Sequence, residues 1–183
     1  MSILEIGPAT SGKTFAQAVT VDSVKRDGLI DHVATWGTDR LPFEDNTFRL
    51  VYASHVLEHV PWFRTGFALS EAFRVLKPNG VLQVWVPDFE IIVQGYLKRE
   101  LPEDWTPLND EREPMKWVAG RLFCGTRNEE ESSWHRSVFD AAYLIRCFKS
   151  AGFAAVRRMV KQPSGQRVNH ESINLGVRGY KPC

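Results

Sequence analysis

The sequence predicts an α/β fold with a mainly parallel sheet that ends in an antiparallel strand. Two short apolar runs, residues 48–53 and 81–86, have the β-branched and aromatic composition of strands buried on both faces of a parallel sheet. Apolar residues recur at helical spacing between these runs, so the segment is predicted to be strand, helix, strand. Two more strand-like segments, residues 153–160 and 172–180, are joined by a polar turn, which predicts a closing hairpin.

The helix between the two central strands has one apolar stripe and a defined end. The stripe consists of Ala68, Leu69, Ala72, Phe73 and Leu76. Lys77-Pro78-Asn79-Gly80 stops the helix, because Pro78 cannot continue it and Asn79-Gly80 favour the positive φ angles of a tight turn. The next strand brings Asp88 to its carboxyl end, the edge at which open α/β sheets bind ligands.

The other elements are predicted from the same apolar patterns. Strands are expected over residues 2–6, 18–22 and 32–36. Helices are expected over residues 89–99, 115–124 and 140–151. Polar composition predicts connections over residues 101–113 and 125–139. Because no internal repeat or second domain is apparent, residues 1–183 are expected to form a single domain.

Composition and charge narrow the class of protein. Hydrophobic residues make up 43% of the 183 residues and charged residues 25%, which is enough apolar material for a substantial core. The formal net charge is +1 and no Lys/Arg run exceeds a pair, so neither nucleic acid nor a membrane is expected as a partner. No secretory signal or membrane span is predicted, and the expected location is cytoplasmic. The three cysteines are widely spaced and predict neither a disulfide framework nor a zinc site.

Residues 7–14 match the phosphate-binding P-loop pattern GxxxxGK[ST] and follow a predicted strand. A P-loop must open a helix whose N-terminal amides hold the phosphates. Residues 15–22 leave room for at most a turn before the next strand, and the strand over residues 48–53 ends without the acidic residue of a Walker B motif. An accidental match is the preferred interpretation, and an NTPase or kinase that uses Lys13 and Thr14 is the alternative.

Several fragments, in their order and spacing, resemble the class I S-adenosylmethionine (SAM) dependent methyltransferases that act on small molecules. LPFEDNTFRLVYASHVLEHV resembles the family's segment that enters its fourth strand and the helix after it. AFRVLKPNGVLQVWVPD resembles the following helix, turn and fifth strand, and NLGVRGYKP resembles the usual last strand. The resemblance implies a Rossmann-like class I methyltransferase fold, SAM as the cofactor and methyl transfer as the activity.

The same resemblance implies a set of cofactor-binding residues. Leu4-Glu5-Ile6-Gly7 resembles the family's first motif, in which Gly7 lets the cofactor approach the backbone. Asp22 ends the second strand, where the family's acidic residue accepts hydrogen bonds from the ribose hydroxyls; the alternative is that Asp22 caps a short turn. Asp39 precedes the LPF triplet, where the family carries an aspartate that contacts the adenine. The implied set is Glu5, Gly7, Pro8, Ala9, Asp22, Asp39, Leu41, Ser54 and His55.

The first motif departs from the family pattern. Ala9 stands where a second glycine is usual, and Pro8 stiffens the loop. The connection to the second strand is also shorter than the usual helix, which resembles a compact branch of the family with its first crossover reduced to a loop. A second alternative follows, in which the methyltransferase fold is catalytically degenerate and acts as a binding module.

Two histidines are the candidate catalytic residues. In the resembling family, a histidine at the position of His59 lies beside the cofactor. His135 lies in a loop that closes over the active site in the branch that this sequence resembles. It is the best general-base candidate, because an unperturbed pKa near ~6.5 suits proton abstraction at neutral pH. The alternative is that His135 only positions the loop.

The HVLEH segment also resembles part of a zinc motif. His55 and His59 are four residues apart, which on a helix places both on one face. The resembling family carries this pattern without a metal, so no metal is expected, and Glu58 is expected to cap or orient the following helix.

Residues 96–139 lie where the resembling family inserts substrate-covering elements. Candidates for the wall of an acceptor pocket, with ordinary core packing as the alternative, are Tyr96, Trp105, Trp117 and Phe123. The neutral charge and the lack of an apolar anchor leave a small-molecule substrate as the expected acceptor, and a sugar or glycan precursor is suggested.

Overall fold

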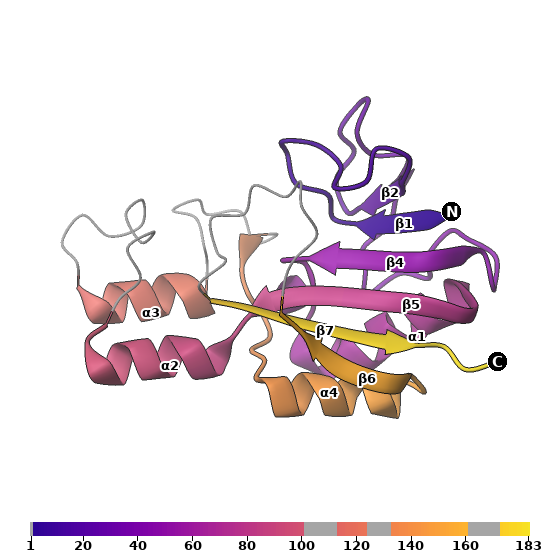
Figure 1. Cartoon of the computed structure of the whole chain (residues 1–183). Coiled ribbons are helices and arrows are strands. Elements are labelled where there is room, and N and C mark those ends of the chain that lie inside the picture. Colours follow the sequence, from indigo (N-terminus) through magenta and orange to yellow (C-terminus); the bar gives the residue numbers. More distant parts are fainter. Residues whose placement is uncertain (1, 101–112, 124–132, 161–172) are drawn as a thin grey trace.

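The computed structural model describes residues 2–100, 113–123, 133–160 and 173–183 (Figure 1). Its described strands are β1 (Ile3–Ile6), β2 (Val19–Asp22), β3 (His32–Val33), β4 (Phe48–Ser54), β5 (Leu76–Pro87), β6 (Ala154–Met159) and β7 (Asn174–Tyr180). They form a seven-stranded sheet in the order β3-β2-β1-β4-β5-β7-β6. The first five strands in this order are parallel, and β7 runs antiparallel to both β5 and β6. The predicted fold class is therefore confirmed.

The helices follow the predicted pattern with one exception. The described helices are the 3-10 turns η1 (Leu57–His59) and η2 (Trp62–Arg64), and the α-helices α1 (Thr65–Val75), α2 (Phe89–Lys98), α3 (Pro114–Leu122) and α4 (Ala141–Ser150). The helix expected directly after β4 is instead replaced by the two 3-10 turns, so α1 begins only at Thr65.

The two faces of the sheet are covered in different ways. Leu4 and Ile6 of β1 point into the main core, which α1 and α4 cover. The alternate residue Ile3 points to the opposite face, where the connection over residues 7–18 packs Ala18 beside it. Phe15 of the same connection contacts Tyr52 edge-on, with ring centroids 5.3 Å apart. This fully described connection contains no helix, which confirms the predicted reduced first crossover.

The predicted tight turn after α1 takes another form. Leu76 pairs with Phe48, and the next pair of β4 and β5 is Leu50 with Val81. Residues 77–80 of β5 therefore form a bulge between these two pairs. Asn79 has the expected positive φ of 61°, whereas Gly80 lies outside that region. The bulge is held by two backbone hydrogen bonds with Lys181. The C-terminal segment therefore fixes this bend, so the turn residues alone do not determine it.

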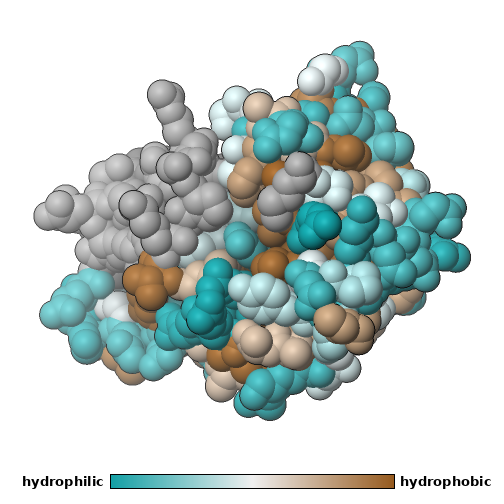
Figure 2. All heavy atoms as spheres, turned by 45° about the vertical axis from the view of Figure 1, so that its right-hand side comes forward, coloured by the Kyte–Doolittle hydropathy of each residue, from teal (hydrophilic) through white to brown (hydrophobic). Residues whose placement is uncertain are grey.

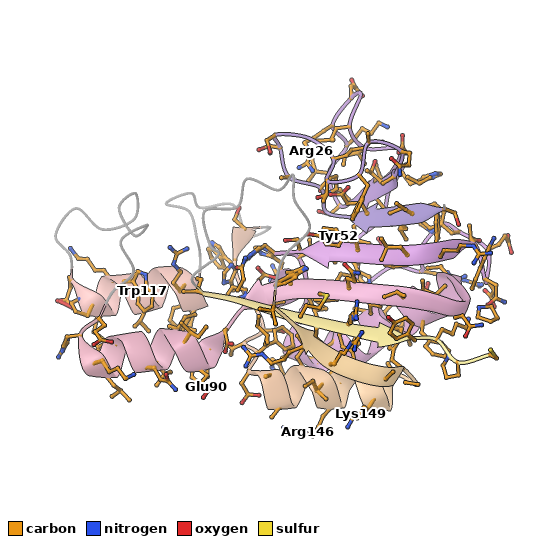
Figure 3. All side chains as sticks on the ribbon, viewed as in Figure 1. Arg26, Tyr52, Glu90, Trp117, Arg146 and Lys149 are labelled. Carbon is orange, nitrogen blue, oxygen red and sulfur yellow. The ribbon has the colours of Figure 1, made fainter. Side chains whose placement is uncertain are left out.

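Helices α2 and α3 pack on each other beside the carboxyl edge of the sheet (Figure 3). Trp117 is 1% exposed and forms a separate small core with Ile92 and Ile173, so it is a core residue and not a pocket wall. Tyr96 is half-buried and Phe123 is 66% exposed, while Trp105 lies outside the described residues.

One face of the molecule is mainly hydrophilic where the structure describes it. Figure 2 shows hydrophilic side chains over most of the described part of one face, with hydrophobic ones in small patches. Among the described helices, none has the length and apolar composition that crossing a membrane requires.

We predict that Gly176 is needed for the packing of the antiparallel edge. It pairs with Trp85 in register, and a Cβ at Gly176 would run into the Trp85 ring. Gly176→Ala should lower the free energy of unfolding by about 1 to 3 kcal/mol, measured by chemical denaturation. The matched control is Gly66→Ala in α1, where a Cβ meets nothing within 4 Å and should be neutral or slightly stabilising. Equal effects of the two changes would contradict this packing role.

Candidate active site

The carboxyl ends of β1, β2 and β4 meet at one edge of the sheet. Ile6 pairs with Val21 on one side and with Ala53 on the other, so the residues that follow these positions lie next to one another. The backbone N–H of Gly7 donates to the Val21 carbonyl at 2.8 Å. This edge faces the side of the molecule where α2 and α3 lie (Figure 1).

The glycine turn after β1 is fixed by packing. Gly7 has a φ of +61°, and an added Cβ would lie 2.5 Å from a methyl carbon of Val56. A side chain at this position is therefore excluded by the protein itself, whether or not a cofactor binds. Pro8, which follows it, is buried, and Ala9 is half-buried.

Glu5 organises the loop that follows. Its carboxylate is 1% exposed and accepts hydrogen bonds from the Thr14 N–H at 2.9 and 3.0 Å. In this structure it therefore anchors the loop, and direct contact of Glu5 with a cofactor stays a prediction.

The loop does not have the geometry of a P-loop. Lys13 donates to the Asp31 carboxylate at 3.1 Å and to the Ala18 carbonyl at 2.9 Å. No helix begins within the fully described residues 7–18, so a helix N-terminus for phosphates is missing there. The match to the phosphate-binding pattern is accidental.

Asp22 lies where the sequence places it, but it has a partner that the sequence analysis missed. Arg26 donates to the Asp22 carboxylate at 2.7 Å and to the Pro8 carbonyl at 2.8 Å, so it bridges the ends of β1 and β2 (Figure 3). The other carboxylate oxygen accepts from the Val24 N–H at 3.3 Å, which is the turn-capping alternative. Because residues 22–26 form no helix, their i,i+4 spacing was no reliable signal for this ion pair.

Asp39 and Leu41 are engaged in structural contacts. Asp39 is exposed and accepts from the Thr35 N–H at 2.8 Å. Leu41 is 1% exposed in the main core, and its N–H donates to Glu71 of α1 at 2.9 Å. The predicted contact of Asp39 with the adenine and that of Leu41 with the cofactor stay predictions.

His55 marks an unusual backbone position after β4. Ser54 ends the strand and is buried, and His55 then adopts a φ of +54°. Its Nδ1 lies 3.2 Å from Glu58 Oε1, and its Nε2 lies 2.9 Å from the side-chain oxygen of Asn174. Because residues 55 and 56 are not helical, His55 and His59 share no helix face, and the expected i,i+4 geometry is wrong. A strained non-glycine residue at a ligand-binding edge is typical of functional sites.

Glu58 is buried at the centre of this region instead of capping a helix. It is 1% exposed, and its Oε2 atom is buried with no hydrogen-bond partner in the part of the chain that the structure describes. Its backbone carbonyl accepts from the N–H groups of Arg136 at 2.7 Å and Ser137 at 3.0 Å. Burial alone would raise the pKa of Glu58, but the hydrogen bond from His55 and the neighbouring histidines outweigh it and hold the pKa below its usual range. The side chain is therefore a carboxylate at neutral pH.

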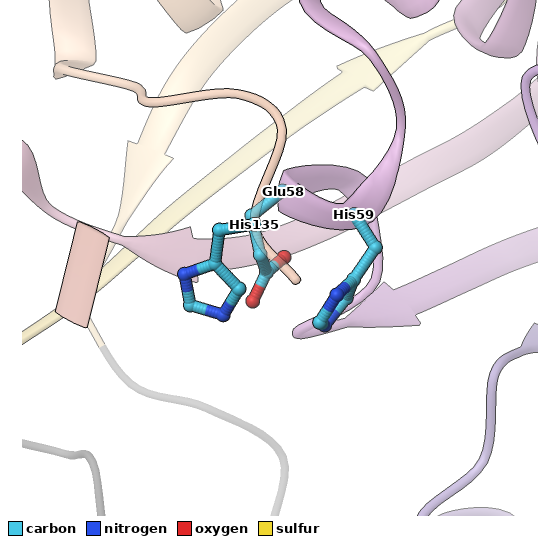
Figure 4. Close-up of side chains that lie close together, drawn as sticks. All are labelled: Glu58, His59 and His135. Carbon is cyan, nitrogen blue, oxygen red and sulfur yellow. The ribbon is translucent and has the colours of Figure 1, made fainter. Parts of the chain in front are cut away.

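The fold brings His59 and His135 together beside Glu58 (Figure 4). The two imidazole rings contact edge-on, with centroids 4.9 Å apart. His59 Nδ1 lies 3.2 Å from the Trp134 carbonyl, and His135 Nδ1 lies 2.9 Å from the Arg121 carbonyl. Burial lowers the pKa of His135, partly opposed by the Glu58 charge, so this ring is neutral at neutral pH. The arrangement offers two half-buried nitrogen bases beside a buried anion.

The edge can hold the nucleoside part of SAM at one end. The Asp22 side chain is 16% exposed, and its carboxylate lies beside the glycine turn. It can therefore accept hydrogen bonds from two ribose hydroxyls once the Arg26 guanidinium is displaced. SAM bound there would bring a methyl group already activated by its sulfonium. The histidine pair lies beyond the end of β4: His59 ends η1, and His135 precedes α4.

Sequence comparisons agree with this geometry. A profile of the methyltransferase domain family matches residues 13–84. A demethylmenaquinone methyltransferase of Staphylococcus haemolyticus is 31% identical over 136 residues, which is 69% of this chain and 49% of that relative. The corresponding enzyme of Staphylococcus aureus strain JH9 is 33% identical over 127 residues, covering 64% of this chain and 45% of the relative. The chain therefore spans about half the length of the curated relatives that it matches.

Solved structures show the same fold. A SAM-dependent methyltransferase of Thermotoga maritima, described as a possible histamine N-methyltransferase, aligns with a TM-score of 0.55 and 20% identity over 98% of this chain and 82% of that one. A 1,6-didemethyltoxoflavin-N1-methyltransferase of Burkholderia thailandensis, solved with bound 1,6-didemethyltoxoflavin and S-adenosylhomocysteine, aligns with a TM-score of 0.58 and 15% identity over 100% of this chain and 72% of that one. The sheet order, the matched domain and the relatives together support a class I SAM-dependent methyltransferase.

Proposed function

We propose that this protein transfers the methyl group of SAM to a small-molecule acceptor at the carboxyl edge of β1, β2 and β4. The proposal rests on the hydrogen bond from the Gly7 N–H to the Val21 carbonyl. This bond joins the glycine turn to the end of β2 and places the Asp22 carboxylate beside the turn. Asp22 would hold the ribose, and His59 and His135 would face the acceptor. Methyl transfer from a sulfonium needs mainly alignment and exclusion of water, so a small set of positioning groups suffices.

The ion pair of Asp22 with Arg26 implies competition at the nucleoside position. Arg26 occupies the Asp22 carboxylate and reaches the Pro8 carbonyl, both of which lie at the cofactor edge. Ribose hydroxyls can donate hydrogen bonds to the Asp22 carboxylate only if they displace the Arg26 guanidinium or share the carboxylate with it. Because the Arg26 side chain is 31% exposed, the ion pair is partly solvated and the cost of displacing it is small.

The acceptor is proposed from charge and from the relatives' names. The formal net charge of +1 gives no basis for a nucleic acid acceptor, which needs clustered Lys and Arg. The curated relatives are named demethylmenaquinone methyltransferases, so a quinone-type precursor joins the sugar or glycan precursor as a candidate. An acceptor screen monitored by release of S-adenosylhomocysteine should include both classes.

The first prediction concerns the ribose position. Asp22→Asn should weaken SAM binding by about 1 to 3 kcal/mol, because it removes a charged hydrogen-bond acceptor while keeping the shape of the side chain. Isothermal titration calorimetry with SAM measures this, and Asp27→Asn at a nearby exposed position is the control. Equal affinities of the two variants would remove Asp22 from the site. Wild-type protein that binds no SAM would favour the degenerate binding module.

The second prediction concerns the competing arginine. Arg26→Ala should tighten SAM binding by up to about fivefold, because it frees Asp22 from a partly exposed ion pair. In the Asp22→Asn background the same change should give no gain. Weaker binding by the Arg26→Ala variant would show instead that the guanidinium contacts the cofactor.

The third prediction separates the two ends of the edge. His135→Ala should reduce turnover at least tenfold and change SAM affinity less than twofold, since His135 faces the acceptor and not the nucleoside. The control is Val138→Ala, an exposed change in the same segment. A loss of SAM affinity with turnover intact would place His135 at the cofactor and make His59 the better acceptor-side candidate.

A further inference from the structure

We propose that Glu58, His59 and His135 form a binding site for a divalent transition-metal ion, with Zn²⁺ as the first candidate and one coordination position open. The ligand atoms of these three side chains all lie within 4.8 Å of one another. Two imidazoles and one carboxylate are a ligand set that zinc uses when it keeps an open position. This inference departs from the sequence-based expectation of no metal, which concerned His55 and His59 on a helix face that does not form.

Both imidazoles are already oriented as metal ligands. A backbone carbonyl only accepts hydrogen bonds, so Nδ1 of His59 donates to Trp134 and Nδ1 of His135 donates to Arg121. A neutral imidazole with its proton on Nδ1 carries its lone pair on Nε2. Outer hydrogen bonds of this kind fix the tautomer and ring orientation of metal-binding histidines. Two residues far apart in the chain therefore have the same tautomer fixed in the same way.

The carboxylate supplies the second, independent observation. Glu58 is 1% exposed, yet its Oε2 atom is buried without a hydrogen-bond partner among the described residues. Its other oxygen is taken by His55 Nδ1 at 3.2 Å. Figure 4 shows the carboxylate between the two imidazole rings. A buried anionic oxygen without a partner is costly, and a bound cation is the partner that removes this cost.

A purely hydrogen-bonded cluster accounts less well for the same contacts. For either histidine to donate to Glu58 from Nε2, its ring must carry protons on both nitrogens and a positive charge. In the tautomers that the backbone carbonyls fix, both Nε2 atoms carry lone pairs, so neither ring donates to the carboxylate. A metal ion binds both lone pairs and neutralises the anion.

Binding requires only a small local adjustment. Zinc–ligand bonds of about 2.0 to 2.2 Å hold tetrahedral ligand atoms roughly 3.5 Å apart, so the three side chains must approach by about 1 Å. His135 lies outside helices and strands, and His59 ends a single 3-10 turn. Both residues are half-buried, which leaves one side of the ion open.

The metal site changes the role of His135. The lone pair that would accept a proton from the acceptor is the one that binds the ion, so a ligand role replaces a direct general-base role. That the open position receives an oxygen of the methyl acceptor rests on the proposed function. Metal binding itself does not, and it is tested without SAM or acceptor.

The test is metal titration of the chelator-treated, tag-free chain. Calorimetry with Zn²⁺ should give one ion per chain, and Co²⁺ should give the intense visible absorption of a four-coordinate ion. His59→Gln and His135→Gln should each weaken Zn²⁺ binding at least about a hundredfold, the upper end of the loss on removing an outer-shell partner. The matched control is His32→Gln, an exposed histidine of β3, which should bind Zn²⁺ like the wild type.

Three outcomes would overturn the proposal: no Zn²⁺ binding by the wild type, binding unchanged in both site variants, or binding lost equally in the His32 variant. Circular dichroism checks that each variant is folded, and Zn²⁺ should raise the melting temperature of the wild type and not of the site variants. Glu58→Gln is a further variant, and the two histidine changes decide the question if it fails to fold. If the chain binds SAM but no Zn²⁺, only the metal-site proposal fails. If it binds Zn²⁺ but no SAM, only the proposed function fails.

Discussion

The buried carboxylate of Glu58 is the constraint on which the site depends. Burying an ionised carboxylate costs several kcal/mol, so the surrounding structure must compensate for it. His55 Nδ1 hydrogen-bonds to one of the Glu58 side-chain oxygens. Separately, the Glu58 backbone carbonyl accepts from the N–H groups of Arg136 and Ser137. The end of β4, the turn η1 and the segment before α4 therefore meet at one residue. Loss of the Glu58 side chain would remove the contact with His55 and leave the backbone contacts with Arg136 and Ser137.

The edge of the sheet is divided between two tasks. At one end, Gly7 and Asp22 form a compact surface with a single carboxylate, already occupied in part by Arg26. At the other end, Glu58 lies beside the imidazoles of His59 and His135, which form the proposed metal site. Under the proposed function, Asp22 binds the nucleoside at the first end, and the histidines at the second end face the acceptor.

The sequence predicted the elements and their order well, because apolar periodicity records which face of a strand or helix is buried. It also placed Asp22 and Gly7 correctly at the ends of β2 and β1. It did not predict the metal-binding geometry, since His59 and His135 meet only through the tertiary fold and the HVLEH segment does not continue as a helix. Asn174, which contacts His55, lies 119 residues along the chain and had no sequence signal.

A crystal structure of the protein with S-adenosylhomocysteine and Zn²⁺, using anomalous diffraction at the zinc absorption edge, tests both ends of this edge at once. We expect the ribose hydroxyls on the Asp22 carboxylate and one anomalous peak bounded by Glu58, His59 and His135. A nucleoside bound away from Asp22, together with a zinc peak on other side chains or none, would contradict the division of the edge proposed here.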